Sequence, residues 1–322
     1  MKTLVTGGAG FIGSHLVGYL LSQGQQVVIL DNFSGVGDEN LKQIRKDNNL
    51  SIIKGTILDQ DLVTKLMQEV TYCYHLAASL GVRKIVDDPI TSLETNLMGS
   101  QIVLSAAADQ GVRTLFASSS EVYGKNPDIP LGENADRVLG SPEIARWSYS
   151  EAKAMDELHA FELYKHKSFP VTIARFFNTV GPNQSGSYGM VLPRFIKAAT
   201  SNQPLIVYGD GTQSRTFCSV LDVVQALVLL MDSKESVGQA FNIGSTNEIT
   251  ITELAQKVIK LTNSSSKVVY KKHSEVFGDN FEEPQRRVPD ISKIKRAVGW
   301  QPKQSLDELI VEISNYLRAN DT

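Results

Sequence analysis

Cysteine is scarce in this chain. Its 322 residues include only Cys73 and Cys218, and neither lies in a C-x-x-C pair. A disulfide scaffold and a thiolate zinc site are therefore not expected, and we predict no metal site. The sequence also has no apolar run near the ~18–20 residues that span a membrane. The strand-like run that follows Met1 has no secretory apolar core, so we expect a cytoplasmic protein.

A surplus of positive charge is likewise missing. Lys and Arg number 32 against 35 Asp and Glu, which gives a net charge of −3. Because nucleic-acid binders are usually basic, we expect no nucleic acid as a partner. The hydrophobic fraction of 42% and the charged fraction of 21% are typical of globular proteins and argue against disorder. The length suits about two domains, or one large α/β domain with an extension.

Short apolar runs alternate with helical patterns over the first third of the chain. The runs are continuous, as in parallel strands that are covered on both faces. Such alternation predicts an α/β fold with a Rossmann-type doubly wound parallel sheet. We predict strands at 3–6, 26–30, 51–54, 70–76 and 114–117, and helices at 11–23, 62–69 and 90–110.

The rest of the chain is less regular. A loop rich in proline, glycine and aspartate spans 124–142, and another polar loop spans 182–189. Between and beyond these loops we predict strands at 171–176 and 205–208, and helices at 149–165, 222–231, 251–261 and 302–320.

A glycine-rich turn follows the first predicted strand and opens the first predicted helix. Gly7, Gly8, Gly10 and Gly13 fit either G-x-G-x-x-G or G-x-x-G-x-x-G. Such glycines let the backbone approach a pyrophosphate, which the free N–H groups of the helix start then bind. Asp31, at the end of the second strand, would hydrogen-bond an adenosine ribose and repel a 2′-phosphate. The pattern therefore predicts NAD as the cofactor.

A second motif carries acid–base chemistry. Tyr149 and Lys153 lie four residues apart, so on a helix both project from one face. An ammonium group beside a phenol stabilises the phenolate, which can take a proton from a sugar hydroxyl. Ser119 follows the fifth strand, where sheets of this kind build their sites, and its hydroxyl can share that proton.

These motifs together resemble the extended short-chain dehydrogenase/reductases that act on nucleotide sugars. The resemblance covers nearly the whole chain. It is carried by TGGAGFIG (6–13), DNFS (31–34), HLAA (75–78), ETN (94–96), SSSEVYG (118–124), YSEAK (149–153), RFFNTVGP (175–182), VYGDGTQSRTF (207–217), FNIGS (241–245) and PQRRVPD (284–290).

The resemblance implies roles for individual residues. Ser119, Tyr149 and Lys153 would be catalytic, with Glu121 beside them as a base or hydroxyl acceptor. The nucleotide-sugar would contact Arg83, Ser120, Asn178, Val191, Tyr208, Arg215 and Arg287. The NAD contacts would be Gly7, Gly10, Phe11, Ile12, Gly13, Asp31, Asn32, Ser34, Gly35, Thr56, Ile57, Leu76, Ala77, Ala78, Asn96, Tyr149, Lys153 and Phe177.

One departure concerns the adenine contact. Many relatives carry Asp after the glycine that follows the third strand, whereas here Gly55 is followed by Thr56. The substrate contacts implied for Arg215 and Arg287, in contrast, also agree with side-chain chemistry, because a planar guanidinium matches a diphosphate bidentately.

The reaction itself is left open between related outcomes that all start with a 4-keto sugar. Our first expectation is a nucleotide-sugar 4-epimerase acting on a UDP-hexose or UDP-hexuronate, favoured by Gly81-Val82-Arg83 after the HLAA motif. The alternative is a UDP-glucuronate decarboxylase, which the Ser120-Glu121 pair, the segment Arg146 to Ser150 and Arg287 resemble. A 4,6-dehydratase is less favoured, because Ser120 replaces the acidic Asp of that group.

Assembly and domain division also follow from the resemblance. We expect an NAD-binding domain at 1–175, to which 212–243 return, and a smaller C-terminal nucleotide-sugar-binding domain at 176–211 and 244–322. Relatives usually form homodimers through a four-helix bundle. The candidate helices are 90–110 and 149–165, and the residues that could line the seam are Leu93, Leu97, Ile102, Leu158 and Phe161. A non-catalytic NAD-binding sensor is the rival class, which an intact Ser119, Tyr149 and Lys153 disfavours.

Overall fold

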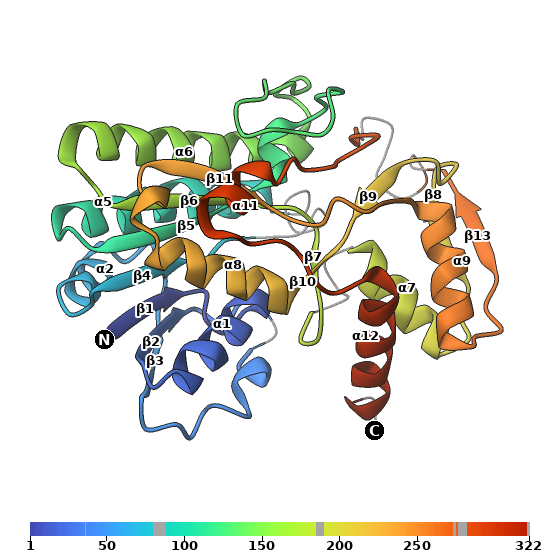
Figure 1. Cartoon of the computed structure of the whole chain (residues 1–322), viewed down its shortest axis with the longest axis horizontal. Coiled ribbons are helices and arrows are strands. Elements are labelled where there is room, and N and C mark those ends of the chain that lie inside the picture. The colour runs from blue at the N-terminus through green and yellow to red at the C-terminus, as the bar shows by residue number, and fades with distance from the viewer. Residues whose placement is uncertain (36, 80–87, 185–189, 273–274, 276–281, 321–322) are drawn as a thin grey trace.

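A seven-stranded parallel sheet organises the larger part of the molecule (Figure 1). The computed structural model describes residues 1–322 except 36, 80–87, 185–189, 273–274, 276–281 and 321–322. The sheet order is β11-β6-β5-β4-β1-β2-β3. Its strands are β1 (Lys2–Thr6), β2 (Gln26–Asp31), β3 (Leu50–Lys54), β4 (Tyr72–His75), β5 (Arg113–Ser119), β6 (Val171–Phe176) and β11 (Gln239–Ile243).

The strand order creates a switch point beside β1. The chain starts in the middle of the sheet, adds β2 and β3 on one side, and then returns to add β4, β5, β6 and β11 on the other. The register places Lys2 opposite Gln26 and Thr3 opposite Tyr72. Because growth reverses between β1 and β4, the carboxyl ends of these strands border a crevice. The doubly wound sheet predicted from the sequence is confirmed.

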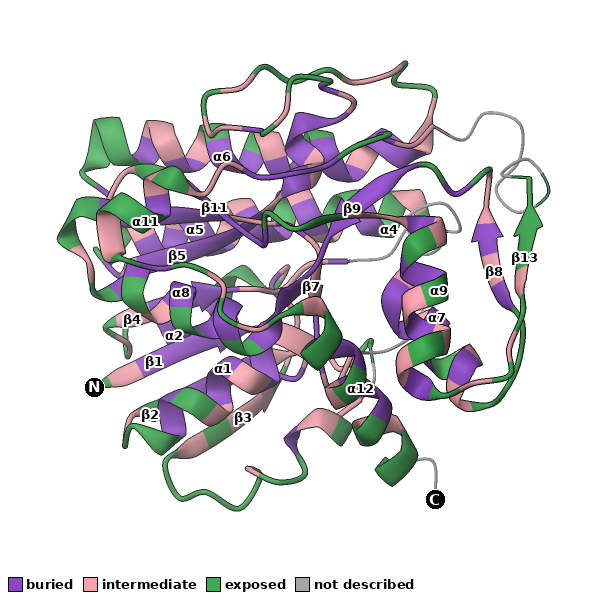
Figure 2. Ribbon diagram, turned by 45° about the vertical axis from the view of Figure 1, so that its right-hand side comes forward, coloured by how far each residue is buried: buried purple, intermediate pink, exposed green. Residues whose placement is uncertain are grey.

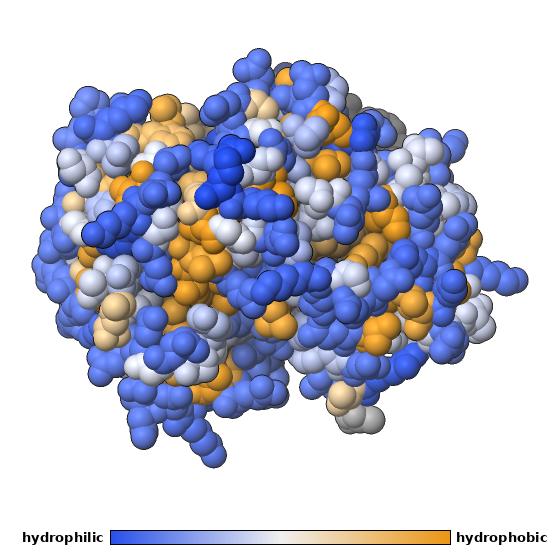
Figure 3. All heavy atoms as spheres, in the orientation of Figure 1, coloured by the Kyte–Doolittle hydropathy of each residue, from blue (hydrophilic) through white to orange (hydrophobic). Residues whose placement is uncertain are grey.

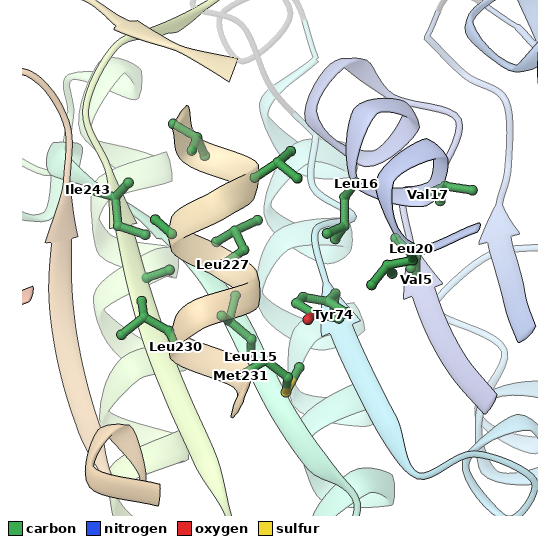
Figure 4. Packing of buried hydrophobic residues seen from close by; sticks show 14 of the residues in the cluster. Val5, Leu16, Val17, Leu20, Tyr74, Leu115, Leu227, Leu230, Met231 and Ile243 are labelled. Carbon is green, nitrogen blue, oxygen red and sulfur yellow. The ribbon is translucent and has the colours of Figure 1, made fainter. Parts of the chain in front are cut away.

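Helices cover both faces of the sheet, in keeping with strands that are apolar on both sides (Figures 1 and 2). On β1, Leu4 packs into the core on one face and its neighbour Val5 into the core on the other. Figure 4 shows the Val5 side, where Leu16 and Leu20 of one helix and Leu227 of another meet the sheet. That face carries α1 (Phe11–Ser22), α8 (Val220–Asp232) and α11 (Ser292–Val298), and the other α2 (Gln60–Met67), α5 (Ser100–Asp109) and α6 (Ser148–Lys167).

A smaller unit with its own apolar core stands beside the carboxyl end of the sheet (Figure 1). Three helices build that core, α7 (Val191–Thr200), α9 (Ile251–Thr262) and α12 (Leu306–Asn320). Three strand pairs accompany them: β8 (Leu205–Tyr208) with β13 (Val268–Lys271), β9 (Ser214–Thr216) with β12 (Glu248–Thr250), and β7 (Thr179–Val180) with β10 (Cys218–Ser219).

The surface is mostly hydrophilic on the face seen in Figure 3, where apolar side chains gather in smaller patches. Leu221 and Leu229 of α8 are among the exposed apolar residues. Over the described ranges, no helix combines the length and the apolar character needed to cross a bilayer.

Several elements differ from the sequence expectation. The helix predicted at 90–110 is three pieces: α4 (Pro89–Leu93), a π-helical stretch η2 (Glu94–Gly99) and α5. The predicted closing helix begins only at Leu306, after Pro302. The strand β11 and the helices α7 and α11 were not predicted. The elements β11 and α11 are short, whereas the apolar residues of α7 recur at helical spacing and could have predicted that helix.

The domain division stays a prediction, and two segments bear on it. Ile294 and Trp300, within the range predicted for the smaller domain, pack into the core beside the sheet. The Trp300 indole anchors this segment by donating to the carbonyl of Asp222 on α8 at 2.9 Å. Residues 214–216, predicted to return to the larger domain, instead pair with β12 of the smaller unit.

We predict that Gly13→Ala destabilises the fold, whereas Gly18→Ala in the same helix does not. A Cβ at position 13 would lie 2.2 Å from the carbonyl oxygen of Gly7 and 2.8 Å from the Cα of Gly8, so the backbone must shift. We expect a loss of about 1–3 kcal/mol in unfolding free energy, measured by urea titration.

Gly18→Ala is the matched control. Its new Cβ meets only Ile44 at 3.9 Å, so better helix propensity should leave stability equal or higher by up to about 1 kcal/mol. Equal stability of the two variants would contradict the close approach at Gly13.

Candidate active site

One large pocket opens at the carboxyl ends of the central strands, at the switch point of the sheet. Sixteen of the predicted NAD contacts line it, from the glycine-rich turn, the ends of β2, β3 and β4, and α6. Two others are buried outside its lining: Asn96, whose side chain is hydrogen-bonded to the backbone of Ser79, and Phe177, which packs near Tyr123. The sixteen are Gly7, Gly10, Phe11, Ile12, Gly13, Asp31, Asn32, Ser34, Gly35, Thr56, Ile57, Leu76, Ala77, Ala78, Tyr149 and Lys153.

The glycine-rich turn is shaped to admit a dinucleotide. Gly7 has a φ of +71°, and a Cβ there would lie 2.7 Å from the backbone nitrogen of Ala77 on the neighbouring strand end. The first turn of α1 begins after Gly10, which has no side chain to cap it, so its N–H groups are open to an anion. The residues present therefore fit the pyrophosphate of NAD.

Asp31 stands at the rim of this turn. One carboxylate oxygen accepts from the N–H of Ala9 at 3.0 Å, and the other accepts from the N–H of Phe33 at 2.8 Å. These bonds fix the carboxylate at the end of β2, and each oxygen retains a lone pair for a ribose hydroxyl. Thr56, at the position where many relatives carry Asp, uses its hydroxyl to accept from the N–H of Leu58 at 3.2 Å.

The predicted catalytic residues come together where β5 ends beside α6. Tyr149 and Lys153 are both buried and both line the pocket. The Lys153 ammonium lies 4.6 Å from the Phe116 ring centroid and 6.0 Å from that of Tyr149. Burial raises the pKa of Tyr149, the charge on Glu121 raises it further, and the Ser119 hydroxyl opposes them. Burial lowers the pKa of Lys153.

A buried ion pair below the site ties three elements together. Glu157 of α6 is held by Arg175 at the end of β6, with Nη2 to Oε2 at 2.6 Å, and accepts from Ser118 of β5 at 2.5 Å. Arg175 also donates to the Tyr123 hydroxyl at 2.8 Å, and that hydroxyl donates to Asn242 of β11 at 2.7 Å. This network fixes α6, and thus Tyr149 and Lys153, against the strand ends.

Glu121 forms the second charged cluster, next to Tyr149. Arg146 binds it bidentately, at 2.9 and 3.2 Å, and Arg287 donates to it at 2.7 Å. Although burial opposes its ionisation, the two guanidinium groups hold the pKa of Glu121 well below its ordinary value. Nε of Arg146, and Nε and Nη2 of Arg287, are buried and have no hydrogen-bond partner among the described residues.

The remaining predicted substrate residues lie toward the smaller unit. Arg215 is buried on β9, where it donates to the Ser214 carbonyl at 2.7 Å and pairs with Glu283. The Tyr208 ring lies 4.2 Å from the Arg194 guanidinium carbon. Asn178 donates to the Thr216 carbonyl, and Val191 is the first residue of α7. Ser120, in contrast, directly follows β5 of the large sheet and is buried in the turn η3 (Ser120–Tyr123). Arg83 lies outside the described residues.

The sequence reasoning passed over three residues that the structure places at this site. Arg146 and Arg175 lie in segments that carry the resemblance, which implies no individual role for either, and Glu157 lies just outside the Tyr149–Lys153 motif. The spacing of Glu157, four residues after Lys153, is a signal that could have found it, because both must then lie on the inner side of α6. Glu283 had no such signal, because its contact to Arg215 joins residues that are 68 positions apart.

Comparison with known proteins identifies the group of enzymes that the chain is similar to. The profile of the GDP-mannose 4,6 dehydratase family matches residues 4–313. A UDP-N-acetyl-alpha-D-glucosaminuronate decarboxylase from Bacillus cytotoxicus is 40% identical over 318 residues, with 98% of each chain covered. UDP-glucuronic acid decarboxylase 1 from Arabidopsis thaliana is 36% identical over 308 residues, which cover 96% of this chain and 68% of the relative.

Solved structures agree on the fold. The UDP-glucuronic acid 4-epimerase from Bacillus cereus, crystallised with UDP-glucuronic acid and NAD, superimposes with a TM-score of 0.89. It is 29% identical, and the match covers 99% of both chains.

We predict that Glu157→Gln lowers the unfolding free energy by about 3 kcal/mol, because it leaves Arg175 buried without its counter-charge. Urea denaturation followed by circular dichroism measures the loss.

The control is Glu162→Gln on the same helix. Glu162 pairs with Lys165 at the surface, where solvent screens the interaction, so its loss should leave the unfolding free energy essentially unchanged. A Glu157→Gln variant as stable as this control would show that the buried pair does not hold α6 in place.

Proposed function

The chain belongs to the GDP-mannose 4,6 dehydratase family, within the extended short-chain dehydrogenase/reductases of nucleotide sugars, and we propose that it is an NAD-dependent decarboxylase of a UDP-linked hexuronate. One observation carries the choice of reaction. Glu121, Arg146 and Arg287, which come from the three segments that resemble decarboxylases in sequence, meet in one cluster beside Tyr149.

The cofactor is NAD, and this chain's residues account for its placement. The glycine-rich turn and the start of α1 would hold the pyrophosphate, and Asp31 would hold the adenosine ribose. Lys153, which lines the same pocket from α6, would contact the nicotinamide end. When bound, NAD accepts a hydride from C4 of the sugar.

Tyr149 acts as the base in that step. Its phenolate takes the proton of the C4 hydroxyl, and the Ser119 hydroxyl shares the developing charge. The phenolate must form against the burial and the nearby carboxylates that raise the pKa of Tyr149. The Lys153 ammonium, 6.0 Å from the Tyr149 ring, and the Ser119 hydroxyl supply the favourable interactions that make this possible.

The 4-keto sugar then loses its carboxylate. A ketone at C4 lies β to the C6 carboxylate, so the C5–C6 bond can break with its electron pair passing into the C4 carbonyl as CO2 leaves. C5 then takes up a proton from water. Return of the hydride to C4, with the Tyr149 proton going to the C4 oxygen, would give the UDP-linked pentose and restore the oxidised cofactor. Glu121 is ionised near neutral pH because its pKa is held low, so it acts as a hydrogen-bond acceptor and not as an acid.

The charge of the Glu121 cluster suits an anionic substrate. Two guanidinium groups surround one carboxylate, which leaves one positive charge in excess and three buried nitrogen donors without a partner in the described part of the chain. Arg287, together with Arg215 from the smaller unit, would bind the diphosphate. The decarboxylase relatives, one of them alike over 98% of both chains, support the same assignment.

A 4-epimerase remains the second candidate. It was the first expectation from the sequence, and the match to a UDP-glucuronic acid 4-epimerase over the whole chain favours it. Both reactions use Ser119, Tyr149 and Lys153 in the same first step. They differ only in whether the 4-keto sugar rotates or loses CO2.

The mass of the product decides between them. The purified protein, supplied with NAD+, is incubated separately with UDP-glucuronate and UDP-N-acetylglucosaminuronate, and the products are separated with mass detection. We expect loss of CO2 from at least one of them, and none with Tyr149→Phe. A new product of unchanged mass would establish the epimerase and overturn the proposal.

We predict that Arg146→Lys lowers kcat/KM by about 10-fold or more, because a lysine cannot make the bidentate contact that holds Glu121. Arg137→Lys is the matched control, since Arg137 is an exposed arginine of the preceding loop that pairs with Glu151. If the Arg146→Lys enzyme were as active as the control, the cluster of Glu121, Arg146 and Arg287 would have no role in the reaction.

We also propose that the protein is a homodimer through α4, η2 and α6. Of the predicted seam residues, Leu93 and Leu158 are exposed, Leu97 is half-buried, and Ile102 and Phe161 are partly buried against the core of their own subunit. Ile90, Met98 and Met155 are exposed on the same elements and extend the apolar surface.

Leu158→Glu should therefore convert the dimer to a monomer in light scattering, because it places a charge in the apolar seam. Leu221→Glu, at an equally exposed leucine of α8, should leave the mass unchanged. A monomeric parent protein would contradict the proposed assembly.

A further inference from the structure

A carboxylate with no partner lies one turn beyond the proposed catalytic lysine. Asp156 of α6 is fully buried, and neither of its oxygens has a hydrogen-bond partner among the described residues. A buried carboxylate without partners is costly, so its presence calls for an interaction that offsets the cost. Glu157, its neighbour, has such an interaction in Arg175, but Asp156 does not share it.

The surroundings of Asp156 point toward Lys153. The two residues lie three apart on α6, a spacing that places them on the same side of the helix. Lys153 is also buried and makes no ion pair within 4.0 Å in the described part of the chain, although it faces the aromatic rings of Phe116 and Tyr149. Lys153 and Asp156 are thus two buried charges of opposite sign, and neither makes a direct ion pair.

Other groups around Asp156 do not neutralise it. Ser100 of α5 faces the carboxylate from across the helix interface, but its hydroxyl forms no hydrogen bond of normal geometry, and that oxygen is also without a partner. The titratable groups that interact with Asp156 are Lys153, Tyr149 and Glu157 of its own helix.

We propose that Asp156 is a positioning residue for the catalytic pair: its unpartnered carboxylate keeps the buried Lys153 ammonium charged, and so lets Lys153 support the Tyr149 phenolate. The proposal rests on the function given above to Tyr149 and Lys153. Among the described residues no hydrogen bond of normal geometry reaches the Asp156 carboxylate, and Lys153 is the positively charged group that interacts with it.

The pKa values of Asp156 and Lys153 are shifted in directions that can be worked out from their surroundings. Burial raises the pKa of Asp156 to about 7, while Lys153 and Ser100 act in the opposite direction. Above that pH the carboxylate is ionised and opposes the loss of the Lys153 proton. Asp156 and Glu157 raise the pKa of Lys153, against the larger effect of burial, which lowers it. Removing the Asp156 charge must therefore lower the pKa of Lys153.

The direct test follows Lys153 without substrate or NAD. The protein is labelled with 13C at lysine Cε, the Lys153 signal is assigned with Lys153→Arg, and its shift is followed with pH. In Asp156→Asn we expect the pKa of Lys153 to fall by about one unit or more, and in Asp156→Glu to stay near the parent value. Glu151→Gln removes an exposed carboxylate from the same helix and should leave it unchanged.

Enzyme kinetics provide the second readout. The alkaline limb of the kcat/KM profile should move to lower pH in Asp156→Asn, whereas a merely structural role would lower activity equally at every pH. Because the lysine titration uses no substrate, it holds even if the reaction proves to be an epimerisation.

The parent protein keeps the proposal testable if Asp156→Asn does not fold. The Lys153 signal of the unaltered protein should then show a second inflection near pH 7, from ionisation of Asp156. Absence of that inflection, or an unshifted Lys153 pKa in a folded Asp156→Asn variant, overturns the proposal.

Discussion

The ion pair between Glu157 and Arg175 is the contact on which the site depends. A charge in the interior must be compensated, and here a single carboxylate meets the guanidinium at the end of β6 and the hydroxyl of Ser118 on β5. The same helix carries Lys153 one turn earlier and Tyr149 two turns earlier, so its distance from the strand ends sets the reach of both. Arg175 extends the constraint through Tyr123 to Asn242 on β11, the last strand of the sheet.

The other buried charges near the pocket form two different arrangements, one with direct ion pairs and one without. Glu121 is saturated by Arg146 and Arg287, which leaves it ionised and leaves the cluster one positive charge in excess for an anionic sugar. Lys153 and Asp156 are buried without a direct contact, so their influence on each other is electrostatic and sensitive to pH. The first arrangement suits binding of a carboxylate or a diphosphate. The second suits control of a proton at Tyr149.

In the proposed mechanism, residues other than Ser119, Tyr149 and Lys153 determine which reaction follows the first step. Both proposed reactions, epimerisation and decarboxylation, use these three residues, since each begins by oxidising C4. Residues that serve this common step therefore cannot distinguish the two reactions. What differs is the set of charges around the keto sugar. In the reaction proposed for this protein, those charges would come from η3 (Ser120–Tyr123), η4 (Ala145–Trp147) and the segment at 282–290, which belong to distant parts of the chain.

The sequence by itself determined the sheet, the glycine-rich turn, the cofactor and the Tyr149–Lys153 pair. Each of these rests on residues close together in the chain: continuous apolar runs, a turn that only glycine fits, and a spacing of four on a helix. It missed the short strand β11, and it missed α7 although the apolar residues of that helix recur at helical spacing. It predicted one continuous helix at 90–110, because a π-helical stretch has no periodic signature in the sequence. Only the tertiary structure decided that Arg146 and Arg287 close on Glu121, that Glu157 meets Arg175, and that Asp156 is buried unpaired beside Lys153. Those facts depend on distances between residues far apart in sequence, and burial, which sets the energy of a charge, exists only once the chain has folded.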